Sequence, residues 1–150
     1  MPRVAKDLPL NELTLRRYEK PFDLSGRELY KKLCLSIGLL QPGDSRDVVV
    51  DVLQILHDAA ARKEWLDAEQ IKDLVIKQRK KLGLPVLGVA SSNIRRQIKR
   101  LKDIYLVETS QNKYRITEFE KLSVLYEKRI EQFLLNNILE RVREYFQMFK

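Results

Sequence analysis

Apolar residues recur at helical spacing through the segment SSNIRRQIKRL, residues 91–101. Ile94, Ile98 and Leu101 follow one another in steps of four and three, which places their side chains on one stripe of an α-helix. This pattern predicts a helix over 91–104 whose apolar stripe packs in a core. The rest of its surface is polar and strongly cationic, with Ser92, Arg96 and Lys99 opposite the stripe and Arg95 and Arg100 at its flanks.

Helix starts are marked along the chain by side chains that can bond free backbone N–H groups. A Ser, Thr or Asp followed three residues later by Glu or Gln predicts a capping box. Together with apolar periodicity, these signals predict further helices over 25–40, 44–62, 67–82 and 118–150. The expected caps are Ser25 with Glu28, Asp44 or Ser45, Asp67 with Gln70, Ser91 or Ser92, and Thr117 with Glu120.

Beyond residue 103 the pattern changes from helical to alternating. Residues 106–109 and 113–117 predict two strands of a hairpin, in which Asn112 takes the left-handed conformation of a tight turn. The alternation predicts Tyr114 and Ile116 facing inward and Lys113 and Arg115 facing outward.

The pattern over 118–150 is the longest helical one in the chain, with a break expected near Asn136-Asn137. Its apolar residues alternate steps of three and four, which is the spacing of a coiled-coil seam. With the apolar helix in 25–43, this seam predicts a homodimer. The seam residues are Leu135, Ile138, Val142, Tyr145 and Phe149.

The elements divide the chain into four parts. We expect an N-terminal arm over 1–24, because three prolines interrupt it, and a helix unit over 25–43. A compact domain should cover 44–117 and a C-terminal helix 118–150. The expected fold class is mainly α with a small β-hairpin.

Charge is concentrated in the centre of the chain. Between Arg62 and Thr117 there are fourteen Lys or Arg and six Asp or Glu, so this segment accounts for the whole net charge of +8. A localised positive field is typical of nucleic-acid-binding proteins. We interpret the run Arg79-Lys80-Lys81 differently, as solvated cations at the negative end of a helix dipole.

Several classes of function are not supported by the residues present. One histidine, His57, and one cysteine, Cys34, provide no catalytic triad, zinc site or disulfide, and no glycine-rich phosphate loop occurs. We therefore expect no enzyme, cofactor or bound metal, and no small-molecule ligand can be identified. No apolar run approaches the roughly 20 residues that span a bilayer. We expect a cytoplasmic protein, and its charge content suits an archaeal source.

The order of helix, short strand, helix, turn, basic helix and hairpin resembles a winged helix-turn-helix domain of bacterial and archaeal transcription regulators. The residues that carry the resemblance are the capped helix 67–82, the basic helix 91–104 and the hairpin IYLVETSQNKYRIT, residues 104–117. The connection over 83–90 is longer than the usual turn of three or four residues. The hairpin tip also lacks the glycine often found there.

The resemblance implies sequence-specific binding of double-stranded DNA by a dimeric transcription regulator, with the basic helix in the major groove and the hairpin as a wing. Ser92, Asn93 and Arg96 are then expected at base edges. The remaining contacts, to phosphates or the minor groove, are expected from Ser91, Arg95, Lys99, Arg100, Lys113 and Arg115.

Two alternatives remain open on the sequence. Winged-helix modules also bind proteins in replication, transcription and membrane-remodelling assemblies, although the outer face of such a module is usually apolar and not cationic. An RNA-binding domain would favour exposed stacking aromatics beside the basic surface. The aromatic residues nearby, Tyr105 and Tyr114, fall at positions expected to be buried.

Overall fold

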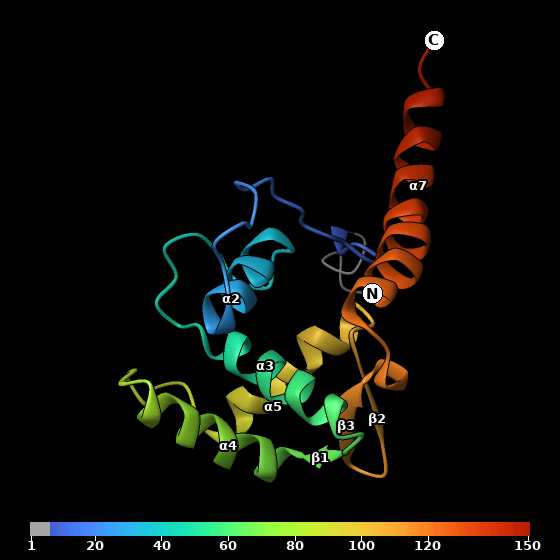
Figure 1. Cartoon of the computed structure of the whole chain (residues 1–150). Coiled ribbons are helices and arrows are strands. Elements are labelled where there is room, and N and C mark those ends of the chain that lie inside the picture. The colour runs from blue at the N-terminus through green and yellow to red at the C-terminus, as the bar shows by residue number, and fades with distance from the viewer. Residues whose placement is uncertain (1–6) are drawn as a thin grey trace.

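The computed structural model describes residues 7–150, so the first six residues of the predicted arm lie outside the described part. The fold is mainly helical with a small antiparallel sheet (Figure 1). Its elements are α2 (Gly26–Ser36), α3 (Val48–Ala61), β1 (Leu66–Asp67), α4 (Ala68–Lys81), α5 (Ser91–Asp103), β2 (Val107–Ser110), β3 (Lys113–Ile116), η1 (Thr117–Phe119), α6 (Leu122–Leu125), η2 (Tyr126–Leu135) and α7 (Asn136–Gln147).

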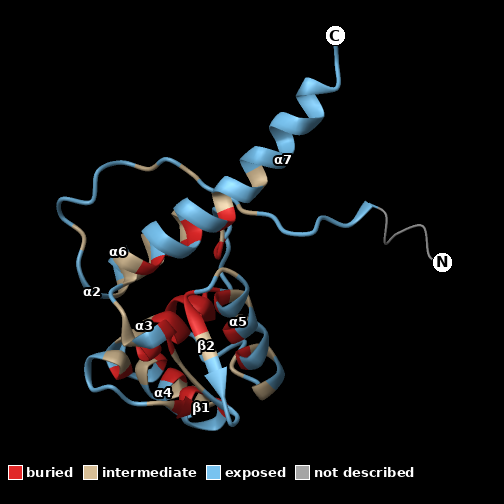
Figure 2. Ribbon diagram, turned by 90° about the vertical axis from the view of Figure 1, so that its right-hand side faces the viewer, coloured by how far each residue is buried: buried red, intermediate tan, exposed pale blue. Residues whose placement is uncertain are grey.

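Helix α3 lies at the centre of the core, in contact with α2, α4, α5 and β3. Val52, Leu53 and Leu56 are completely buried, and the most deeply buried residues gather around this helix (Figure 2). Val48, Ile55 and Ala59 of the same helix are buried as well. The stripe of α5 is confirmed, since Ile94, Ile98 and Leu101 are all buried.

The predicted hairpin is confirmed, and a third strand extends it. The sheet order is β1-β3-β2, with Leu66 opposite Tyr114 in one antiparallel pair and Val107 opposite Ile116 in the other. Asn112 takes a left-handed φ of 63°, as predicted, and Gln111 joins it at 52°. The two-residue turn therefore closes without glycine, because the backbone of both residues adopts positive φ.

The capping predictions succeed at one helix start and fail at the others. Asp67 and Gln70 form the predicted capping box of α4. Ser25 makes no side-chain cap at α2, where Gly26 enters the helix with a φ of 57°. The cap predicted at Asp44 or Ser45 is also wrong, because α3 begins at Val48, after Asp47. The Asp44 carboxylate instead accepts a hydrogen bond from the backbone N–H of Arg46.

The caps predicted for α5 and for the C-terminal helix are also wrong, because neither helix begins at the residue that the pattern predicted. Helix α5 begins after Ala90, and Ser91 already lies within it. Thr117 is buried, and its hydroxyl donates to the Tyr105 carbonyl oxygen at 2.8 Å instead of capping a helix. The chain then turns through left-handed Glu118 and Phe119, so the helix starts only at Leu122.

The C-terminal helical segment is continuous. Its central part, η2, is π-helical and passes into α7 at Asn136 with helical backbone angles, so the break predicted near Asn136-Asn137 is wrong. Ile130 and Leu134 of η2 are buried, whereas α7 contains no buried residue. Helix α7 projects away from the rest of the molecule (Figure 1).

The arm passes over the C-terminal end of α2. The Arg16 guanidinium donates to the carbonyl oxygen of Leu35 at 2.8 Å, which satisfies a group near the helix end, and to that of Leu40, beyond the helix, at 3.1 Å. The contact is close enough that a Cβ on Gly38, whose φ is 76°, would meet the Thr14 side chain at 2.6 Å. Cys34, Ile37, Leu39 and Leu40 of the segment 25–43, which the sequence assigned to a dimer, are buried within the chain's own core, and the arm contacts the end of this segment.

A buried cluster of four charges joins α2, α3 and α4. Asp51 of α3 is fully buried, and its carboxylate accepts from Arg27 Nε at 3.0 Å and from Arg79 Nη1 at 2.6 Å. Asp47 also pairs with both arginines, at 3.0 Å each. Gln78 donates to Asp51 at 2.7 Å. Two positive and two negative charges cancel, so the cluster buries charge without a net excess.

The environment of this cluster shifts two pKa values. Burial disfavours the charged carboxylate of Asp47, but hydrogen bonds and charge from Arg27 and Arg79 outweigh it and lower its pKa. Burial opposes the charge of Arg27, and Asp51 and Asp47 outweigh it and raise that pKa. Both partners therefore stay ionised at neutral pH.

The interpretation of Arg79 as a solvated cation is wrong. Arg79 is only 3% exposed, and its side chain turns inward to the two aspartates. Lys80 and Lys81 are exposed, as predicted. Cys34 is fully buried, and burial raises the pKa of its thiol to about 12.

Substitution of Arg79 tests the cluster. Arg79→Met should lower the free energy of unfolding by about 3–5 kcal/mol, because it leaves buried carboxylates short of a positive partner. The neighbouring Lys80→Met removes an exposed cation and should change stability by less than about 0.5 kcal/mol. Urea unfolding of both variants makes the comparison, and equal stabilities would contradict a structural role for Arg79.

Stability should also depend on pH through Asp47. Its folded pKa lies below the unfolded value, so its contribution is present above about pH 4 and is lost as pH falls through the folded pKa. Asp47→Asn should be less stable than the wild type at pH 7, and it should lose less stability as the pH falls below about 4. Parallel stability profiles for the two proteins would exclude this contribution.

Candidate nucleic-acid interface

Helix α5 presents its cationic face to solvent because its apolar stripe is fixed against α3. Ser92, Arg95, Arg96 and Lys99 are exposed, whereas Arg100 is half-buried. Within residues 7–150, Arg95 and Arg96 form no ion pair, and Lys99 pairs with Asp103 one turn later at 3.0 Å. The two arginines are therefore available to an external anion, as is the exposed Lys102 near the other end of the helix.

Arg100 is held against the molecule. Its guanidinium donates to Gln97 Oε1 at 2.9 Å and lies 3.4 Å from the Gly38 carbonyl oxygen, just beyond α2. The sequence placed Arg100 among the phosphate contacts, and the structure places it between α5 and α2. An external phosphate would have to compete with both of these contacts.

Two polar residues at the start of α5 are also engaged within the molecule. Ser91 donates to Glu69 Oε1 at 3.0 Å and lies 3.3 Å from Lys72 Nζ, so its hydroxyl links α5 to α4. The Asn93 amide donates to the Gly88 carbonyl oxygen at 2.6 Å and accepts from Gln97 at 3.0 Å. Neither side chain is free in the way that a base or phosphate contact requires.

The hairpin contributes one free cation and one that is enclosed. Lys113 is exposed and forms no ion pair within the described chain. The Arg115 guanidinium lies 4.4 Å from the centre of the Trp65 ring and 4.6 Å from that of Phe119, and its Nε lies 2.6 Å from Glu108 Oε2. Arg115 therefore holds the hairpin to its neighbours, whereas the alternation predicted a cation facing outward.

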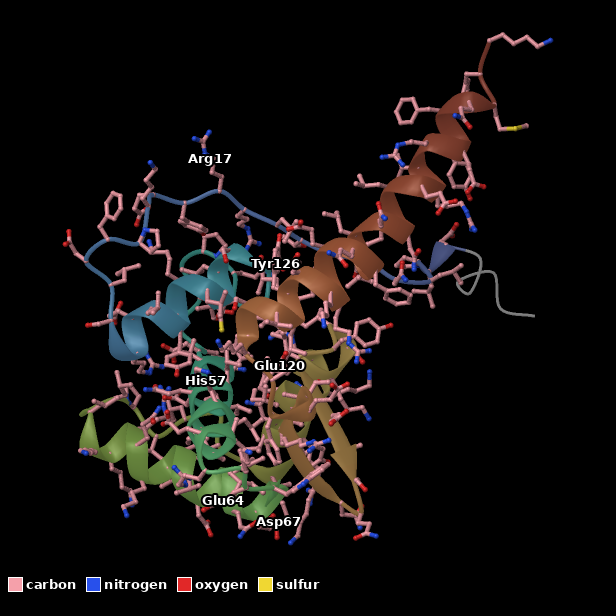
Figure 3. All side chains as sticks on the ribbon, turned by 45° about the vertical axis from the view of Figure 1, so that its right-hand side comes forward. Arg17, His57, Glu64, Asp67, Glu120 and Tyr126 are labelled. Carbon is pink, nitrogen blue, oxygen red and sulfur yellow. The ribbon has the colours of Figure 1, made fainter. Side chains whose placement is uncertain are left out.

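Arg95 stands at the junction of three elements. With Asp67, Glu69, Asn112 and other residues it lines a hollow of about 400 Å³ between the start of α4, α5 and the hairpin tip. Asp67 lies at the same end of the molecule as the hairpin tip (Figure 3). The exposed end of α5 and the tip of the hairpin are consequently parts of one surface.

The long connection between α4 and α5 is fixed at two points. Arg79 Nε donates to the Pro85 carbonyl oxygen at 2.8 Å, and the Asn93 amide holds the Gly88 carbonyl. The unusual length of this segment is thus compensated by bonds from the helices on either side. Sequence reasoning missed the inward position of Arg79, because its aspartate partners are 28 and 32 residues away.

Other sites are not formed by the part of the chain that is described. In residues 7–150, no group of three or more His, Cys, Asp or Glu side chains is arranged to hold a metal ion. No helix in the same range has the length and apolar character to cross a membrane. His57 Nδ1 lies 2.6 Å from the Tyr30 hydroxyl, which joins α3 to α2.

Asn93→Ala should lower the free energy of unfolding by about 1 kcal/mol, because the Gly88 carbonyl loses its donor and α5 loses an anchor. Ser92→Ala, at the adjacent exposed position, is the matched control and should change stability by less than about 0.5 kcal/mol. Chemical denaturation of both variants measures the difference. If Asn93→Ala is as stable as the control, its two hydrogen bonds do not hold the connection.

Comparisons with known proteins leave this surface to be interpreted from its own geometry. No family model, curated protein or solved structure matches the chain. The exposed cations of α5 and the adjoining hairpin are therefore the observations from which a function is inferred.

Proposed function

We propose that this chain binds double-stranded DNA in a sequence-specific manner, as a transcription regulator with a winged helix-turn-helix domain. The observation that carries the proposal is the outer face of α5. Its apolar stripe is fully buried, so Arg95 and Arg96 are held outward, and neither has an acidic partner within residues 7–150. Exposed cations without an acidic partner are suited to neutralise phosphates.

The topology supports the same proposal. The elements α3, β1, α4, α5, β2 and β3 follow in the order that the resemblance to winged helix-turn-helix domains implies. β3 lies between β1 and β2, so the hairpin stands beside the start of α4. The major groove of B-DNA is about 12 Å wide and admits an α-helix. Helix α5 is the basic helix available to enter it, and the hairpin is the wing.

The side chains of this surface divide into two groups under the proposal. Arg96 and Ser92 face outward near the start of α5, where an arginine can bond the N7 and O6 atoms of guanine. Arg95, Lys99 and Lys113 meet phosphates, which position the protein without reading sequence. The other four residues expected at the DNA shape the surface from within: Ser91, Asn93, Arg100 and Arg115.

Fluorescence anisotropy with labelled duplex DNA over a salt series tests the proposal. Wild-type affinity should fall steeply with salt, because binding releases counterions. Arg95→Ala with Arg96→Ala should bind more weakly and should reduce the slope of log K against log salt by roughly two, about one for each phosphate that the variant no longer neutralises.

A variant with the same charge loss at another site provides the control. Arg17 projects outward from the arm, on a different part of the molecule from the hairpin (Figure 3), and Lys20 is also exposed on the arm. Arg17→Ala with Lys20→Ala should leave the slope unchanged. If the two double variants behave alike, only general charge matters. If the wild-type protein does not bind duplex DNA, the winged domain is to be tested as a protein-binding module.

A further inference from the structure

Helix α7 carries a large apolar surface that the described chain does not cover. Among its residues and those just beyond its end, Tyr145 is 68% exposed, Phe146 75% and Phe149 81%. Leu139, Val142 and Met148 are exposed as well. Figure 2 shows α7 exposed along almost its whole length, in contrast to the helices of the core.

The size of this surface is close to that of a protein interface. An aromatic side chain buries about 150–250 Å² when it is fully covered, so the exposed parts of the six side chains amount to roughly 700 Å². A standard interface covers about 800 Å² on each partner. Monomeric proteins rarely expose a contiguous apolar patch of this size. An interaction surface explains it better than an isolated helix does.

The spacing of the apolar residues favours another helix as the occupant. Ile138, Val142, Tyr145 and Phe149 follow steps of four, three and four, which forms a straight seam on one side of α7. The Phe149 amide still donates to the Phe146 carbonyl at 3.2 Å, so the seam continues to the end of the helix. Leu139 and Phe146 widen the same side.

We propose that two copies of this chain associate through α7, with the two helices antiparallel about a twofold axis near Arg143 and Glu144. In this alignment Val142 of one copy packs against Tyr145 of the second copy, and Ile138 packs against Phe149 of the second copy. The twofold axis repeats both contacts, and it also places Leu139 beside Phe146 of the second copy. All of the exposed seam is then covered by identical surface.

Charge favours this antiparallel alignment. It brings Arg141 to the same side of the interface as Glu144 of the second copy, and the symmetry repeats the pair. Within one chain these two side chains interact only loosely, at 3.6 Å, and both are more than half exposed. Residues 136–150 contain three cations and two acids, so two copies meet with little net repulsion.

The arm supplies a place for the end of the second helix. Leu8, Leu10, Ile138 and Val142 are among the residues that line a groove of about 760 Å³ between the arm and α7. In the antiparallel pair, Phe149 of the second copy enters this groove next to Ile138. The proposed interface involves α7 and the arm, whereas the sequence alone also assigned the helix in 25–43.

Light scattering without DNA tests the association independently of the proposed function. At micromolar concentration the mass should be twice the 17.8 kDa of one chain. Tyr145→Glu should weaken association at least about 100-fold, since each dimer buries this ring twice. Gln147→Glu adds the same charge on the opposite side of α7 and should leave the mass unchanged. Circular dichroism checks that Tyr145→Glu keeps the folded core.

Cysteine crosslinking tests the alignment, because Cys34 is buried and leaves introduced thiols as the reactive ones. Val142→Cys and Tyr145→Cys chains, mixed and oxidised, should form the mixed crosslinked dimer in preference to either chain with itself. Crosslinking of each chain with itself would indicate parallel helices and overturn the alignment. A mass of one chain, or of more than two, would overturn the proposed pair and indicate another occupant for this surface.

Discussion

The buried pairing of Arg27 and Arg79 with Asp47 and Asp51 is the interaction on which the arrangement of the other elements depends. Asp51 is inaccessible to solvent, so its charge is tolerated only while α2 and α4 present their arginines to it at about 3 Å. The apolar core would accept several small rotations of these helices, because hydrophobic contact is not directional. Bidentate and charge-assisted hydrogen bonds tolerate far less rotation, and the cluster thereby fixes three helices relative to one another.

The same cluster reaches the exposed surface through one side chain. Arg79 binds both aspartates with Nη1 and the Pro85 carbonyl with Nε, so a single guanidinium connects the core to the segment before α5. Asn93 fixes the other end of that segment. The direction of the outer face of α5 is therefore set by buried hydrogen bonds as well as by its apolar stripe. Preorganisation of this kind reduces the entropy that binding would otherwise cost.

The cationic residues illustrate how composition and structure differ. Each of Arg79, Arg95, Arg100 and Arg115 adds one positive charge to the composition, but in the folded chain they have four different surroundings. Arg79 is buried in an ion cluster, Arg100 bonds a glutamine and a carbonyl, and Arg115 lies between two aromatic rings. Only Arg95 of the four has none of these within residues 7–150. The positive field of the segment from 62 to 117 is consequently concentrated on fewer side chains than its composition indicates.

The sequence by itself determined the features that depend on interactions between residues close together in the chain. The apolar stripe of α5, the capping box at Asp67, the hairpin and left-handed Asn112 depend on residues only a few positions apart, and all are present. Tertiary structure decided what depends on distant partners. Ser25 and Thr117 have the right neighbours for caps, but the backbone enters and leaves those positions in directions set by packing. The inward turn of Arg79 was decided in the same way, because its aspartate partners are 28 and 32 residues away. The hydrogen bonds of a side chain with several possible partners are decided only when folding brings one of those partners within about 3 Å.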